Sequence, residues 1–311
     1  MGALIEVIAP VFILIGVGYL AVWRGVFSAT GADALMRFAQ TIAIPFLLFR
    51  AISTLDLSAG FDPRLLASFY TGSTVNFALG MLGARYLFGR PWQDSVAIGF
   101  AALFANTVLL GLPIMERAFG ADALAPNYAI IAFHAAFCYL LGMTTMEVVK
   151  SGGGGLGHIV RTVSSAMFHN ALMIGIAAGL IANIVGLRLP IPVTAALDLM
   201  AASALPVALF ALGGVLSRYR SEGETRIVIW VSGLSLFVHP AVALFMSVWV
   251  FDLPQTLVRG AVLTASMAPG VNSYIFAHMY GRATRIAASV VLVGTALSIV
   301  SVSFWLWVLG A

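Results

Sequence analysis

Residues 104–113 read FANTVLLGLP, and residues 266–273 read SMAPGVNS. Each stretch places asparagine, glycine and proline together in the middle of a long apolar segment. Proline lacks the amide hydrogen that a helix needs, and glycine costs about 1 kcal/mol in a helix interior. We therefore expect both segments to be helices that break in their middles and free backbone carbonyls and amides there.

The residues around these two stretches are predominantly apolar. Of 311 residues, 61% are hydrophobic and 9% are charged, and the mean hydropathy is +1.03. A soluble domain carries about 25% charged residues, and so few charges cannot cover a surface that faces water. The composition therefore predicts an integral membrane protein. The net charge of +4 does not indicate a nucleic-acid partner, because the basic residues are scattered rather than clustered with aromatic ones.

Apolar segments of membrane-spanning length recur along the whole chain. We expect an all-α protein with transmembrane helices at residues 4–23, 33–53, 63–88, 92–118, 125–149, 158–184, 192–216, 226–250, 254–279 and 283–309. No basic residue precedes the first segment, which therefore predicts a retained helix rather than a cleaved signal peptide. The two interrupted stretches then fall in the fourth and ninth helices.

A run of four glycines follows the fifth predicted helix. We interpret residues 151–157 as a flexible cytoplasmic tether. It joins a first five-helix repeat, residues 1–150, to a second, residues 158–311. Because each repeat has an odd number of helices, the two would insert in opposite orientations as an inverted repeat.

The second helix of each half carries a related motif. Residues 44–49 read IPFLLF, and residues 205–210 read LPVALF. Pro45 and Pro206 occupy the same position in the two motifs. Either proline alone would indicate only a kink; together with the matched interruptions of helices four and nine, they favour two related halves.

The basic residues predict the orientation of this arrangement. Eleven of the 16 lie at the ends of helices that face one side, and four lie at the other side, namely Arg64, Arg117, Arg188 and Arg259. Because basic residues favour the cytoplasmic side, we expect a multi-pass protein of the cell inner membrane with both termini outside. Arg50 is left out of this count, because it lies near a helix end. Its side chain would either extend to the interface or serve as a substrate counter-ion.

At these motifs the sequence resembles the auxin efflux carrier family, which includes plant PIN proteins and bacterial permeases for malonate and related acids. The resemblance rests on Asn106-Thr107, on Gly111-Leu112-Pro113, on residues 268–272 (APGVN) and on the motif at residues 44–49. It implies two inverted five-helix repeats that form a scaffold-like bundle and a transport bundle. It also implies that helices four and nine cross where they break, with the substrate near that crossing.

The candidate site residues follow from the two interruptions and from this resemblance. The substrate-binding candidates are Asn106, Thr107, Asn272 and Ser273, and the helix-break candidates are Gly111, Pro113, Pro269 and Gly270. The supporting candidates are Pro45, Pro206, Asn76 and His134. The two site asparagines would alternatively form ordinary hydrogen bonds between helices. For His134, a neutral hydrogen-bonded ring is favoured over a proton relay.

The chemistry of the two broken segments favours an anionic substrate. Neither segment contains Asp or Glu, and the N-termini of half-helices attract carboxylates. We therefore predict a secondary transporter for a small organic anion such as a carboxylate, working by alternating access. The alternative is a sodium-coupled organic-anion symporter of the bile-acid type; a channel and a structural membrane protein are further alternatives.

Other classes of function lack support in the sequence. It contains no catalytic motif of the hydrolase or metalloprotease type, and Cys138 is the only cysteine. We therefore expect no enzyme, no cofactor and no metal site. The expected partners are the substrate and membrane lipid, with H⁺ or Na⁺ as candidate coupling ions and a homodimer as a candidate assembly. The direction of transport and the role of Glu147 stay open.

Overall fold

The computed structural model describes residues 2–55, 62–150, 171–219 and 225–311. Within these ranges the chain is helical, and its only strand-like feature is an isolated antiparallel bridge between Ala105 and Pro269. Seven of the described helices are long and apolar enough to cross a membrane. The predicted all-α membrane class is confirmed, whereas the count of ten helices stays a prediction. The predicted tether, residues 151–157, lies outside the described residues.

The elements before the predicted tether follow the expected apolar segments. They are α1 (Gly2–Trp23), α2 (Ala29–Phe38), the π-helical turn η1 (Ala39–Ala43), α3 (Ile44–Ser53), α5 (Pro63–Tyr86), α6 (Trp92–Leu103), the π-helical turn η2 (Thr107–Gly111), α7 (Leu112–Phe119), the 3₁₀ turn η3 (Ala121–Leu124) and α8 (Ala125–Val149). The second predicted helix thus begins at Ala29, four residues earlier than expected, because Ser28 caps it by accepting a hydrogen bond from the amide of Gly31 at 2.9 Å.

The elements after the predicted tether follow the same pattern. They are α10 (Ala171–Ile184), α11 (Ile191–Leu216), α12 (Thr225–Gly233), η4 (Leu234–Val238), α13 (His239–Phe245), η5 (Met246–Val250), α14 (Gln255–Ala265), α15 (Asn272–Tyr280) and α16 (Thr284–Val308), with η4 and η5 as π-helical turns. The first part of the sixth predicted helix, residues 158–170, lies outside the described residues. The ninth predicted helix is divided into α14 and α15.

The helix ends are specified by local sequence. Asp62 caps α5 by accepting a hydrogen bond from the Arg64 amide at 2.8 Å, and Pro63 occupies the first turn, where its missing amide hydrogen costs nothing. The side chain of Arg64 also binds the carboxylate and lowers the pKa of Asp62. Gly281 ends α15 with a φ of 63°, a left-handed conformation that glycine adopts without strain.

The chain divides into two compact units. The larger unit consists of Met1–Ile8, Phe61–Val163 and Tyr219–Ala311, and the smaller one of Ala9–Gly60 and Ser164–Arg218. Each unit therefore takes elements from both predicted halves instead of matching one of them. The proposed division into residues 1–150 and 158–311 concerns repeats along the sequence, and it stays a prediction.

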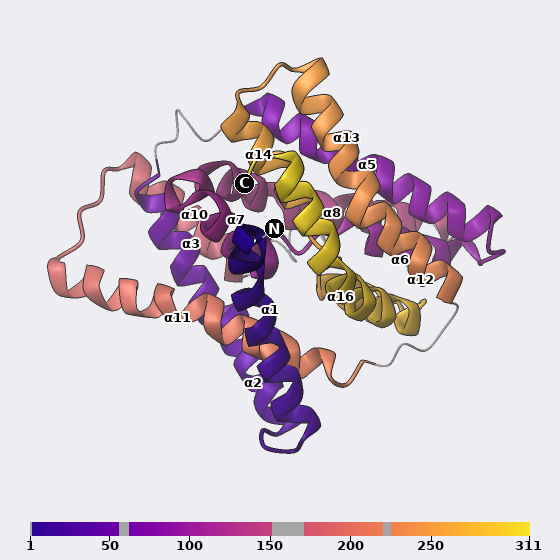
Figure 1. Cartoon of the computed structure of the whole chain (residues 1–311), viewed down its shortest axis with the longest axis horizontal. Helices are drawn as coiled ribbons and strands as arrows, with labels where there is room; N and C mark the ends of the chain where they lie inside the picture. The colour runs from indigo at the N-terminus through magenta and orange to yellow at the C-terminus, as the bar shows by residue number, and fades with distance from the viewer. Residues whose placement is uncertain (1, 56–61, 151–170, 220–224) are drawn as a thin grey trace. The chain divides into compact units, whose positions relative to one another are not determined.

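Glycine allows close helix packing in the smaller unit. α10 lies beside α3 (Figure 1), and a Cβ atom at Gly175 would lie 2.6 Å from the carbonyl oxygen of Pro45. In the same unit, a Cβ atom at Gly18 would overlap the carbonyl oxygen of Phe210. Small residues permit such contacts between backbones in membrane helices.

Arg50 has a partner that neither sequence-based interpretation included. Its Nε lies 2.6 Å from Oδ1 of Asp198, so an ion pair joins α3 to α11 within the smaller unit. The side chains are 33% and 52% exposed, respectively. The ion pair adds a partner for Arg50, while its interfacial and substrate-binding roles stay predictions.

In the larger unit, α5 packs against α6 and α13, and α12 packs against α16 (Figure 1). Close contacts again occur at glycines, since a Cβ atom at Gly72 would lie 2.7 Å from the ring of His239. His239 Nε2 lies 3.1 Å from Ser73 Oγ and 3.3 Å from the carbonyl oxygen of Phe69. The two interrupted segments belong to the same unit.

Candidate functional site at the crossing of two broken helices

The two interrupted segments meet within the larger unit. α6 ends at Leu103 and η2 begins at Thr107, while α14 ends at Ala265 and α15 begins at Asn272. The backbone amide of Asn106 donates to the carbonyl oxygen of Ala268 at 2.8 Å. The amide of Gly270 donates to the carbonyl oxygen of Phe104, also at 2.8 Å. The two unwound segments thus hydrogen-bond to each other as a short antiparallel bridge.

Gly111 and Pro113 lie after the break rather than in it. Gly111 has helical dihedrals (φ −62°, ψ −51°), and its amide donates to the carbonyl oxygen of Asn106 at 3.1 Å, five residues earlier. This wide π-helical turn leads directly into α7, whose first turn contains Pro113. The missing amide hydrogen of a proline costs little at that position. The unwound residues are Phe104 to Asn106 instead.

Side chains from three other helical elements satisfy carbonyls at the break. In a continuous helix, the carbonyl of Ala102 would accept from the amide of Asn106, but that amide is bound across the crossing. The carbonyl of Ala102 instead lies 3.2 Å from Asn76 Nδ2 and 3.3 Å from Ser235 Oγ. The carbonyl of Ala105 lies 3.2 Å from His134 Nε2. Unwound backbone at membrane depth requires such partners.

The side chain of Asn106 has one free polar group. Its Oδ1 accepts from the amide of Leu109 at 3.2 Å and so caps the following helical turn. Its Nδ2 is buried and has no partner among the described residues. Leaving a buried donor unpaired costs about 1–3 kcal/mol. This amide is therefore available to a ligand at the crossing.

On the other strand of the crossing, Asn272 and Ser273 begin α15. Asn272 Oδ1 lies 3.5 Å from the hydroxyl of Tyr139, at the outer limit of a hydrogen bond. Ser273 is fully buried, and its Oγ has no partner among the described residues. Tyr139 was not predicted, because it lies in an apolar run of α8 with nothing in its spacing to mark it.

The remaining predicted residues are distributed between the units. Thr107 is buried at the start of η2, and Pro269 packs against α16, where a Cβ atom at Gly294 would lie 2.9 Å from the proline Cδ. Pro45 and Pro206 belong to the smaller unit, whereas the crossing belongs to the larger one. Among the described residues, no group of His, Cys, Asp or Glu side chains is arranged to hold a metal ion.

The chain is similar to known transport proteins over almost its whole length. A family model described as membrane transport protein matches residues 3–154 and 156–306. A Rhizobium meliloti protein named "Putative malonate transporter" is 22% identical, over 99% of this chain and 97% of its own. A Methanothermobacter thermautotrophicus protein named "Uncharacterized transporter" is 28% identical, over 96% of each chain. Auxin efflux carrier component 8 of Arabidopsis thaliana is 22% identical, over 93% of each.

Proposed function

Because the chain belongs to the membrane transport protein family, we propose that it is a secondary carrier for a small organic anion such as a carboxylate. The predicted resemblance to auxin efflux carriers is confirmed. The prediction of a transporter rather than an enzyme is also confirmed, since the relatives are named as transporters and carriers. The substrate would bind at the crossing and be exposed to each side of the membrane in turn.

The observation that carries this proposal is the unpaired Nδ2 of Asn106. It is a buried donor beside the start of η2, and α15 begins on the opposite strand of the crossing. Helix N-termini favour negative charge. Neither broken segment contains an acidic residue that would repel a carboxylate or bind a cation. Malonate is the first ligand to test, because it appears in the name of the Rhizobium meliloti relative.

A thermal-shift screen of the purified full chain tests this proposal. We expect at least one small carboxylate, with malonate tested first, to raise the melting temperature, because a ligand present at about 100 times its Kd adds about 2.7 kcal/mol of stability. The matched control is the uncharged diamide of the same acid, which should have no effect. If no carboxylate in the panel acts, or if the diamide acts equally, the proposal is wrong. Stabilisation that requires sodium rather than potassium would favour the sodium-coupled alternative.

The packing of the smaller unit supports two inverted five-helix repeats. Phe49 and Phe210 end the matched motifs of the second helix in each half. The carbonyl oxygen of Phe49 would lie 3.0 Å from a Cβ atom at Gly179 of α10, and that of Phe210 would overlap one at Gly18 of α1. Equivalent carbonyls of the two motifs thus meet glycines of the first helix in the opposite half. This reciprocal packing is what an inverted repeat predicts.

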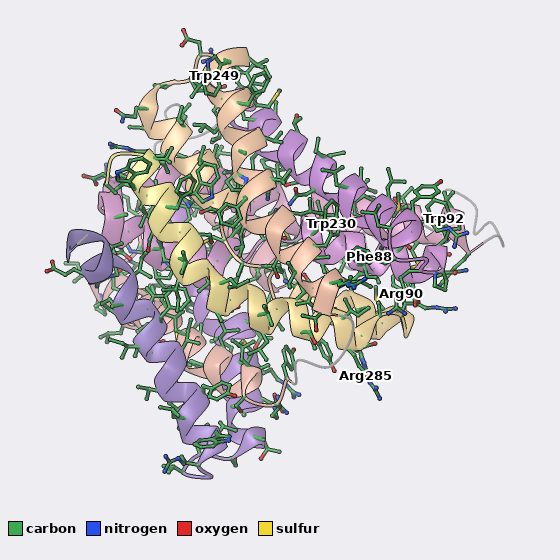
Figure 2. The ribbon with its side chains drawn as sticks, turned by 45° about the vertical axis from the view of Figure 1, so that its right-hand side comes forward. Phe88, Arg90, Trp92, Trp230, Trp249 and Arg285 are labelled. Carbon is green, nitrogen blue, oxygen red and sulfur yellow. The ribbon has the colours of Figure 1, made fainter. Side chains whose placement is uncertain are left out.

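The larger unit also supports the proposed orientation. Figure 2 shows Arg90, Arg285 and Trp92 near one end of this unit and Trp249 near the other. Tryptophan is enriched at both membrane interfaces, and basic residues at the cytoplasmic one. We propose that the end with Arg90 and Arg285 is cytoplasmic and that both termini lie outside.

Fusion of alkaline phosphatase to the C-terminus tests this orientation. The enzyme folds only outside the cytoplasm, so we expect an active fusion. As the control, a fusion placed after Arg90 should be inactive, because that residue lies at the end that we propose to be cytoplasmic. An inactive C-terminal fusion combined with an active fusion after Arg90 would reverse the proposed orientation.

A further inference from the structure

The imidazole of His134 contacts the crossing directly. Its Nε2 lies 3.2 Å from the carbonyl oxygen of Ala105, the residue that forms the antiparallel bridge with Pro269. A carbonyl oxygen only accepts hydrogen bonds, so the proton of the ring lies on Nε2. His134 is in the middle of α8, whereas Ala105 lies in the unwound segment after α6. The ring therefore fixes the crossing from a neighbouring helix.

The second ring nitrogen has no strong hydrogen-bond acceptor beside it among the described residues. Sγ of Cys138, one turn further along α8, lies 3.6 Å from Nδ1 and 3.8 Å from Nε2 of His134. Because the sulfur is almost equally far from both nitrogens, it does not lie on the axis of the Nδ1 lone pair, and sulfur is only a weak acceptor. Protonation would add an N–H group at Nδ1 without a strong acceptor. The observed contacts therefore fit the neutral ring.

Among the described residues, the groups around the ring are aromatic or neutral. The ring of Phe104 lies edge-on with its centroid 4.7 Å away, and that of Phe69 lies 5.5 Å away. The titratable groups that face His134 from other described helices are Tyr70 of α5, stacked at 6.3 Å, and His239 of α13, whose ring also packs against Phe69, at 4.9 Å. Among the described residues, no Asp or Glu hydrogen-bonds to the ring. An unpaired charge buried there would be costly.

We propose that neutral His134 is a positioning residue of the carrier. By holding the carbonyl of Ala105, it fixes the direction of the next residue, Asn106, whose Nδ2 is the proposed ligand donor. This inference rests on the proposed function. It differs from a proton relay, because His134 keeps its proton on Nε2 throughout transport and passes none on.

Two substitutions of similar polarity separate these roles. In His134→Gln, the amide nitrogen lies about as far along the side chain as Nε2 and can still donate to Ala105. In His134→Asn, the amide nitrogen lies only as far as Nδ1 and cannot reach that carbonyl. We expect the Asn variant to raise the half-saturation concentration for radiolabelled malonate uptake in proteoliposomes roughly tenfold, because a buried carbonyl loses its partner. The Gln variant should stay within about twofold of the native protein, with the same dependence on pH from about pH 6 to about pH 8.

A second measurement does not depend on any substrate. Hydrogen exchange of the full chain in detergent, at one pH and without ligand, should show faster exchange in His134→Asn at the amides of Asn106 and Gly270, but not in His134→Gln.

The possible outcomes separate the substrate from the positioning role. If the native protein does not transport malonate, malonate is the wrong substrate, and hydrogen exchange still tests the positioning role. Loss of transport in the Gln variant with a protected crossing would establish a proton relay and overturn the proposal. Native behaviour of both variants would also overturn it. If the Asn variant does not fold, the Gln variant alone tests the proposal. The proposal requires this variant to transport the substrate and to exchange its amide hydrogens as the native protein does.

Discussion

Gly18→Ala is expected to destabilise the protein strongly. The new methyl group would overlap the carbonyl oxygen of Phe210, which is backbone and cannot rotate away. α1 and α11 would have to separate where they now touch. Overpacking of this kind costs about 1–3 kcal/mol or more. We therefore expect the melting temperature of the full chain in detergent to fall by about 5–10 °C.

Gly16→Ala is the matched control for this substitution. Gly16 lies in the same helix two residues earlier, and a Cβ atom there would meet nothing within 4 Å. Alanine is also the better helix former by about 1 kcal/mol, so the melting temperature should stay equal or rise. Gly213→Ala should lower the melting temperature as Gly18→Ala does, because its methyl group would overlap the carbonyl oxygen of Ile15. Equal melting temperatures for Gly16→Ala and Gly18→Ala would show that this contact does not hold the two helices.

Sequence alone predicted the helical elements because lipid imposes a simple rule on them. Every spanning segment must be apolar and must pair its own backbone groups. Interruptions of such a segment are therefore visible as Gly, Pro and Asn in an apolar run. The position of the break within helix four was less accurate. We expected the break at Gly111 and Pro113, but the chain unwinds at Phe104 to Asn106. Gly111 ends a π-helical turn, and Pro113 fits the first turn of α7, so neither residue interrupts the helix.

The partners of the crossing could not be predicted from spacing. Asn76, His134 and Ser235 each reach a freed carbonyl from a different element, far away in sequence. In the sequence, Asn76 and His134 were indicated only as polar residues in apolar helices, and a polar residue there equally fits an ordinary hydrogen bond between helices. No feature of the sequence indicated Tyr139. Such contacts depend on how the helices pack, which a hydropathy pattern does not contain.

Substitution of Asn106 is expected to have the largest effect on transport. Asn106→Ala removes the unpaired Nδ2 donor, and a hydrogen bond to a charged ligand contributes about 1.5–3 kcal/mol. We expect the affinity for a carboxylate to fall by roughly 10- to 150-fold, and Asn272→Ala to act in the same direction. Ligand titration by thermal shift and uptake into proteoliposomes both measure the loss. The control is Asn127→Ala, another buried asparagine of the larger unit, whose Nδ2 binds Thr264 Oγ1 at 2.7 Å. The Asn127→Ala variant should be less stable than the native protein but should bind the carboxylate with the same affinity.

The sign of the substrate charge is tested by Asn106→Asp. This variant keeps an oxygen that can cap the amide of Leu109, but it replaces the Nδ2 donor with an acceptor that carries negative charge. For an anionic substrate, Asp must bind more weakly than Ala at this position, because repulsion is added to the loss of the donor. For a cationic substrate the order would reverse, since the new carboxylate would attract it. Tighter substrate binding by Asn106→Asp than by Asn106→Ala would therefore exclude an anion at the crossing. Unchanged transport in both Asn106→Ala and Asn272→Ala would place the binding site elsewhere in the chain.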